Sequence, residues 1–79
     1  MSSYQHSAEI RVRSPKAELL HRALLPELQD EISTRSFVEL SYSGEELAVL
    51  IRARDLVSLR ASFNAWGRLL NIALHILEQ

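Results

Sequence analysis

The chain has 79 residues, a formal net charge of −1 and no cysteine. A chain this short forms one domain, its charge gives no general attraction to nucleic acid or anionic lipid, and it has no disulfide, thiolate metal site or thiol nucleophile. No apolar run reaches the roughly 18 residues of a membrane span, and Met1–Ser7 does not resemble a signal peptide. The sequence therefore predicts a soluble cytoplasmic protein.

The N-terminal half contains one expected strand and one expected helix. Met1–Ser7 is polar and aperiodic, which predicts a flexible tail before a single domain over residues 8–79. Ala8–Arg13 alternates apolar and polar residues, as a half-buried strand does. Ser14 followed by proline is a helix-start signal and predicts a helix over Pro15–Leu25.

Proline interrupts this helical pattern. Pro26 lacks a backbone N–H, so we expect it to stop or kink the helix. The mostly polar segment Glu27–Thr34 is then expected to form a loop or a ragged extra turn.

Two further strands follow. Arg35–Tyr42 alternates, and so does Leu47–Arg54, whose odd-numbered positions are apolar. The turn between them, Ser43–Glu46, contains Gly44, which supplies a positive φ. The two strands are therefore expected to form an antiparallel hairpin.

The predicted order is strand, helix, strand, strand, helix, which indicates an α+β fold. If the three-stranded sheet is wholly antiparallel, the first strand lies beside the third, and the spatial order is 2-3-1. Both helices are expected to pack on one face of this sheet.

Asp55 caps a final helix, Asp55–Gln79, that is apolar around an unusually wide arc. At about 100° per residue, one apolar face consists of Leu56, Leu59, Phe63, Trp66, Leu70, Ala73, Leu74 and Leu77. A second apolar face beside it consists of Ala61, Ala65, Leu69, Ile72 and Ile76. The polar residues occupy a strip of about 80° and are Arg60, Asn64, Arg68, Asn71, His75 and Glu78.

A surface helix usually needs an apolar stripe of about 100° or slightly more, and this one has about twice that. We therefore expect another chain to cover the surplus. The polar strip is either a wetted edge or a row of hydrogen-bond donors at that interface. The small residues Ala61, Ala65 and Gly67 either allow close approach of another helix or are simply tolerated, and Trp66 is expected in the core.

Arginine supplies eight of the nine basic residues. Four of them fall on the solvent side of the first and third strands: Arg11, Arg13, Arg52 and Arg54. If these strands are neighbours, we expect one patch suited to RNA phosphates. The alternative is that they pair with Glu9 and Glu39 and only keep the sheet soluble. Phe37 is the one aromatic candidate there for stacking on bases.

Catalysis by the isolated chain is not expected. His6, His21 and His75 have no acid or cysteine nearby at metal-ligand spacing. Gly44 and Gly67 are too few for a phosphate-binding loop. The sequence predicts no enzyme, no metal site and no cofactor.

The final helix resembles the C-terminal helix of the Pcc family, which supplies the small dimerising subunit of the KEOPS (EKC) complex. The residues that carry the resemblance are Asp55-Leu56-Val57-Ser58-Leu59-Arg60-Ala61, Asn64 and Arg68-Leu69-Leu70. Upstream, Ala23-Leu24-Leu25-Pro26 and Arg35-Ser36 also fit. The likeness covers Ala8–Gln79, departs at Ala65-Trp66-Gly67, and fits either the main family member or a diverged paralogue.

The resemblance implies a non-catalytic scaffold. KEOPS installs threonylcarbamoyladenosine on tRNA, and the Pcc-type subunit dimerises, packs its helices against the catalytic subunit and helps to hold tRNA. The implied partners are a second Pcc-type chain (identical or paralogous), the catalytic threonylcarbamoyltransferase subunit, and tRNA within the complex. The candidate interface residues are Leu59, Arg60, Ala61, Asn64, Ala65, Arg68, Leu69, Ile72 and Ile76.

Two other functions would fit parts of the sequence. A free-standing RNA-binding module of the KH type fits the arginine-lined sheet, but the chain lacks the GxxG loop with which that class clamps the RNA backbone. A small enzyme would need scattered histidines and acids to converge.

Overall fold

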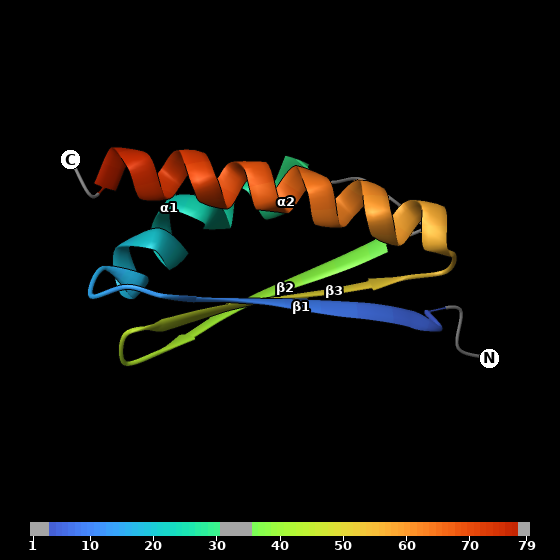
Figure 1. Cartoon of the computed structure of the whole chain (residues 1–79), viewed down its shortest axis with the longest axis horizontal. Helices are drawn as coiled ribbons and strands as arrows, with labels where there is room; N and C mark the ends of the chain where they lie inside the picture. The colour runs from blue at the N-terminus through green and yellow to red at the C-terminus, as the bar shows by residue number, and fades with distance from the viewer. Residues whose placement is uncertain (1–3, 31–35, 78–79) are drawn as a thin grey trace.

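The computed structural model describes residues 4–30 and 36–77. Its elements in chain order are β1 (His6–Arg13), α1 (Ala17–Asp30), β2 (Ser36–Ser43), β3 (Glu46–Ala53) and α2 (Leu56–Leu77) (Figure 1). The predicted order of elements is confirmed. The predicted residues Glu31–Arg35 and Glu78–Gln79 lie outside the described part of the chain.

The sheet is antiparallel throughout, with the order β1-β3-β2. This is the predicted 2-3-1 order read from the other edge. Ser43 pairs with Glu46, so the hairpin loop has two residues, and Gly44 at its first central position has a φ of 59°. That geometry is typical of a type II′ turn, whose twist matches that of the strands it connects.

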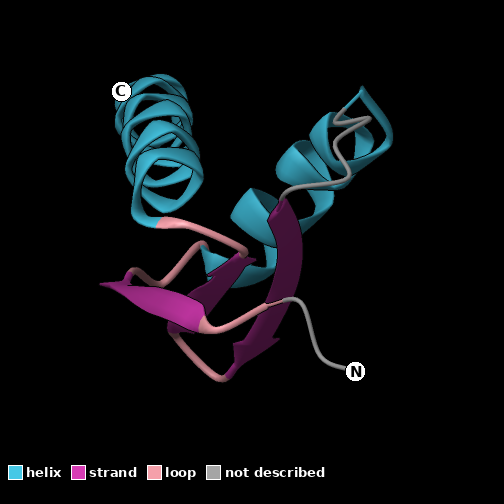
Figure 2. Cartoon of the chain, turned by 90° about the vertical axis from the view of Figure 1, so that its right-hand side faces the viewer, coloured by secondary structure: helices cyan, strands magenta, loops and turns pink. Residues whose placement is uncertain are grey.

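Both helices cover the same face of the sheet (Figure 2). Because β3 is the central strand, its inward residues are the most deeply buried part of the sheet, as the alternating pattern predicts. The buried core cluster consists of Ala17, Leu20, Leu24, Leu47, Val49, Ile51, Trp66 and Leu70.

The first strand begins earlier than predicted. β1 starts at His6, which pairs with Ala53, so two residues of the expected tail belong to the sheet. Because both residues are polar, the alternation of apolar and polar residues did not reveal that they belong to the strand.

Helix α1 begins later than predicted and does not stop at its proline. The N–H of Ser14 donates to the carbonyl of Glu45 (2.7 Å), and Ser14 Oγ accepts from the N–H of Lys16 (3.0 Å), so a turn precedes the helix. Pro26 lies inside the helix. The carbonyl that loses its partner is that of Arg22, an exposed residue, where water can replace the missing donor.

Helix α2 is fixed at both ends. At its start, Asp55 Oδ1 accepts from the N–H of Ser58 (2.7 Å), which confirms the predicted N-cap. At its end, Lys16 Nζ donates to the carbonyl of Leu77, so a cation lies at the negative end of the helix dipole. Over residues 4–30 and 36–77, no helix combines the length and apolarity needed to cross a membrane.

Candidate protein-interaction surface

Helix α2 runs lengthwise over the sheet, and only one side of it is buried (Figure 1). Trp66 and Leu70 are in the core, and the hydroxyl of Ser62, also buried, donates to Ser36 Oγ (3.0 Å). Sequence reasoning missed Ser62, because a serine gives no hydropathy signal. The residues that pack partly against the core are Leu59, Leu69, Ala73, Leu74 and Leu77.

Two residues assigned to the core-facing side are in fact largely exposed. Leu56 is 61% exposed, in the first turn of α2, and Phe63 is 43% exposed. Phe63 lies over β1, and β1 is an edge of the sheet, so no further strand covers its ring. The apolar surface left open is therefore wider than the second face alone.

The residues of the second apolar face of α2 differ in how far they are buried. Ile72 and Ile76 are 58% and 66% exposed, and Ala61 and Ala65 are also exposed. Leu69 is half-buried and packs against the core. Two isoleucines at i and i+4 thus stand side by side in solvent.

These isoleucines border a groove between the two helices, which we call the helical groove. It has a volume of about 230 Å³. Its lining is apolar apart from Glu27 and consists of Ala23, Leu24, Glu27, Leu69, Ile72, Ala73, Ile76 and Leu77. A groove of this kind suits the apolar ridge of another helix.

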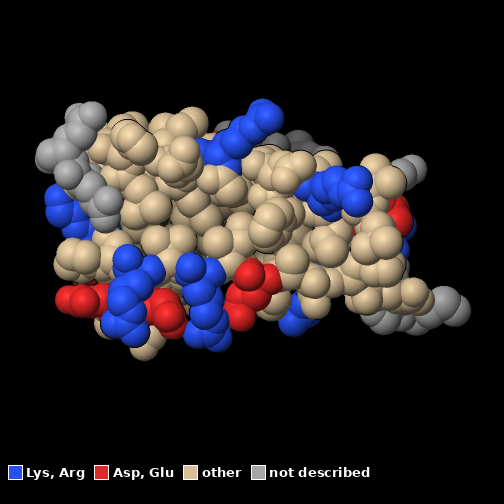
Figure 3. All heavy atoms as spheres, viewed as in Figure 1, with Lys and Arg blue, Asp and Glu red and all other residues tan. Residues whose placement is uncertain are grey.

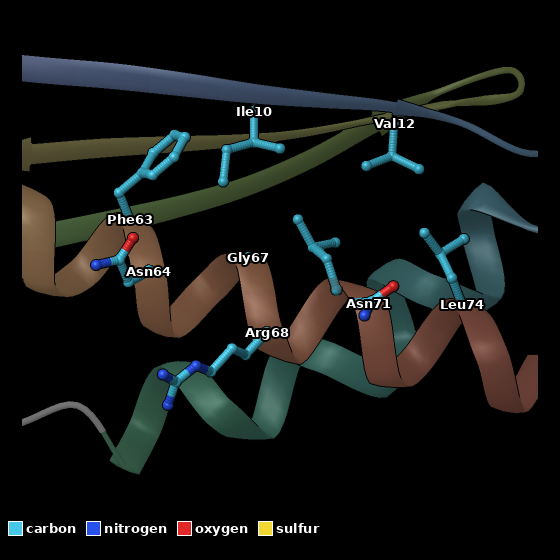
Figure 4. A pocket seen from close by; sticks show the side chains of 9 residues that line it. Ile10, Val12, Phe63, Asn64, Gly67, Arg68, Asn71 and Leu74 are labelled. Atoms are coloured by element: carbon cyan, nitrogen blue, oxygen red, sulfur yellow. The ribbon is translucent and has the colours of Figure 1, made fainter.

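A larger groove, about 720 Å³, lies on the other side of α2, between that helix and β1. We call it the edge groove. Ile10 and Val12 point from β1 towards α2, and Phe63 and Leu74 point back towards the strand (Figure 4). Gly67 lies between them on the helix, and a Cβ added there would meet nothing within 4 Å.

The strand that forms one wall of the edge groove also has an unpaired backbone edge. In the described part of the chain, β1 pairs only with β3. It has eight residues, long enough to serve as a template for another strand. A groove lined by both apolar and polar side chains therefore lies next to an open strand edge.

The polar strip of α2 is exposed throughout its described length, Arg60 to His75. Asn64, Arg68 and Asn71 belong to the border of the edge groove. The side chains of this strip can donate hydrogen bonds to a chain seated in the edge groove.

The charged side chains are unevenly distributed over the molecule. Basic and acidic side chains alternate along part of the sheet side of the view in Figure 3, whereas much of the surface above is uncharged.

The four sheet arginines do not form the one patch that was predicted. Arg11 lies opposite Ala48, whereas Arg52 lies opposite Ser7, which precedes Arg11 by four residues in β1. Because each residue of a strand advances about 3.3 Å, the two pairs of arginines lie at opposite ends of the sheet.

Arg11 forms ion pairs with glutamates, which was the alternative to a role in RNA binding. Its Nε donates to Glu9 (3.1 Å) and its Nη1 to Glu46 (2.9 Å). The hydrogen bond and charge of Glu9, with a further contribution from Glu46, raise the pKa of Arg11 above its ordinary value. Two carboxylates thus already neutralise this arginine.

At the other end of the sheet, Phe37 has an aromatic partner that sequence reasoning missed. The ring of Tyr4 lies 6.5 Å from that of Phe37, centroid to centroid. Tyr4 falls in the segment expected to be a flexible tail, so its position beside β2 follows only from the sheet topology.

The histidines expected to stay apart do not gather into a metal-ligand cluster in the described residues. No three His, Cys, Asp or Glu side chains there could together hold a metal ion. The ring of His21 packs against that of Tyr42 (4.9 Å between centroids), and His75 is exposed on α2.

Comparison with known proteins identifies the family. A family model described as transcription factor Pcc1 matches residues 5–78. No curated protein matches the sequence significantly. The match covers nearly the whole chain, including every strand and helix described above.

Proposed function

Because the chain belongs to the Pcc1 family, that of the small subunit of KEOPS, and so has a KEOPS-associated role in tRNA modification, we propose that it is a dimerising scaffold of that complex. In this proposal it acts in the cytoplasm. It binds a second Pcc-type chain and the catalytic threonylcarbamoyltransferase subunit, and it helps to hold tRNA. The family is in general non-catalytic, and we propose that this chain is as well.

The two grooves beside α2 support two different protein partners. The helical groove is bordered by Ile72 and Ile76, which are more than half exposed, and it suits a helix of the catalytic subunit. The edge groove lies beside an open strand, so a second Pcc-type chain could extend the sheet and cover the groove at once. These two grooves, one apolar and one of mixed lining beside an open strand edge, are the observation that carries the proposal.

The family is described as transcription factor Pcc1. Within the described residues, the β2–β3 hairpin separates α1 from α2, so the two helices do not form a helix-turn-helix.

Co-purification with the catalytic subunit tests the helical groove. We expect Ile72→Asp and Ile76→Asp each to abolish binding, because a carboxylate would be buried there without a partner. Both positions are exposed in the single chain, so the fold should survive, which far-UV circular dichroism would verify.

Val57→Asp is the matched control. Val57 lies on the same helix, is 80% exposed and borders neither groove. It should leave binding unchanged. Leu69 is less suitable as a test position because it packs partly against the core. Retention of the catalytic subunit by both isoleucine variants would contradict the assignment.

A further inference from the structure

A group of two aromatic rings and two guanidinium groups lies at one end of the sheet, which we call the aromatic–arginine cluster: Tyr4, Phe37, Arg52 and Arg54. Phe37 is 47% exposed and Tyr4 37%. Their rings are tilted by 47° to each other, and Arg54 Cζ lies 5.9 Å from the centroid of Tyr4. This last geometry is that of a cation–π contact.

The register of the sheet places the cluster on the face away from the helices. Phe37 lies directly opposite Arg52, which lies opposite Ser7, and all three are exposed. Side chains directly opposite each other on neighbouring strands point to the same face, with Cβ atoms about 5 Å apart. Arg54 follows Arg52 by two residues and is exposed as well.

The core makes no use of this group. Phe37 is not among the residues buried in or packed against the core, and its outward neighbour on β2, Glu39, is exposed and charged. The opposite end of the same face is different, because Glu9 and Glu46 pair with Arg11 there. On the outward face of the sheet, as far as the structure describes it, open aromatic surface therefore lies beside positive charge at this end and not at the Arg11 end.

We propose that the aromatic–arginine cluster binds single-stranded RNA, with an unstacked base on the ring of Phe37 and the neighbouring phosphates on Arg52 and Arg54. Exposed aromatic rings beside arginine are a general means of holding single strands, because every base has a π-face and every nucleotide a phosphate. This inference rests on the proposed function, in which tRNA is the source of the RNA, and it names the surface that contacts it.

The direct test is a titration of the full chain with octauridylate, followed by NMR. We expect shifts of the backbone and side-chain signals of the cluster, and none at Arg11 or Arg13. An eight-base-pair RNA duplex, whose bases stay stacked, should produce smaller shifts at the cluster. Equal shifts with duplex, or shifts confined to the Arg11 end, would overturn the proposal.

Two substitutions give the quantitative test, by fluorescence anisotropy of the labelled octamer. Phe37→Leu keeps an apolar side chain but removes the stacking ring, and should weaken binding about fivefold to a hundredfold. Arg52→Ala should reduce the slope of log K against log salt by about 0.7, the value for one phosphate contact of a single strand.

Arg13→Ala is the matched control, since it removes the same charge from the same face at the other end. It should leave the affinity within about twofold. Wild-type affinity in Phe37→Leu, or an equal loss in Arg13→Ala and Arg52→Ala, would contradict the site. Binding of Phe37→Leu to the catalytic subunit is measured in parallel. An intact complex with unchanged RNA affinity rejects the site alone, whereas failure of the wild-type complex rejects the proposed scaffold.

Discussion

Neighbouring positions on one face of α2 have different roles in this protein. Leu69, Ile72 and Ile76 share a side of the helix by spacing, yet Leu69 packs on the core while both isoleucines are more than half exposed. All three side chains line the helical groove, but only Leu69 also packs against the buried core cluster. Whether a residue of this helix face is buried therefore depends on which other residues pack against it.

The N-cap of α2 provides a prediction at the scale of one residue. Asp55→Ala removes the acceptor for the N–H of Ser58 and should lower the free energy of unfolding by about 1 kcal/mol. Asp55→Asn keeps a capping oxygen and should lower the free energy of unfolding by only about a few tenths of a kcal/mol. Urea denaturation followed by Trp66 fluorescence measures both. Equal losses in the two variants would show that the carboxylate charge matters more than the cap.

At the scale of elements, α2 serves two surfaces at once. Its core side holds Trp66 and Leu70, and its flanks form one wall of each groove. Helix α1 is shorter; it contributes Leu20 and Leu24 to the core, and it lends Ala23 and Leu24 to the helical groove. The two helices thus stabilise the domain and together form the helical groove.

Gly67 gives a prediction for the helix as an element. A Cβ at this position meets nothing within 4 Å, and alanine favours a helix over glycine by about 1 kcal/mol, so Gly67→Ala should stabilise the isolated chain by that amount. If a second chain approaches closely in the edge groove, the same change should weaken dimerisation.

Gly67→Ala should therefore stabilise the single chain but weaken the dimer. Chemical denaturation at low protein concentration measures the first, and analytical ultracentrifugation the second. A variant that is more stable and dimerises as well as the wild type would contradict close approach at Gly67.

The molecule as a whole is elongated. Its extents are 42 × 20 × 18 Å, with a radius of gyration of 12.6 Å. A domain of this size buries only about 60–65% of the surface that its unfolded chain exposes, and is marginally stable by itself. A second chain that covered the open edge of β1 and the edge groove would then stabilise the domain.

Dimerisation provides the prediction at this scale. If a second copy covers the edge groove, the thermal midpoint should rise with protein concentration, because the dimer is favoured by mass action. Phe63→Asp, in the edge groove, should give a monomer by light scattering, whereas Ile72→Asp should remain dimeric.

Two results would contradict pairing of identical chains through the edge groove. A wild-type monomer with a midpoint independent of concentration would contradict pairing with an identical chain and would point to a paralogous partner. Loss of the dimer in Ile72→Asp, with retention in Phe63→Asp, would reverse the two groove assignments.

The sequence by itself determined the element order, the strand order, the inward face of β3 and the cap of α2, because alternation, turn glycine and capping residues are local signals. It also indicated surplus apolar surface on α2. Tertiary structure alone decided the rest: the exposure of Phe63 at the sheet edge, the separation of the arginines by register, and the contact between Tyr4 and Phe37. These depend on which residues far apart in the chain become neighbours, and no local pattern specifies that.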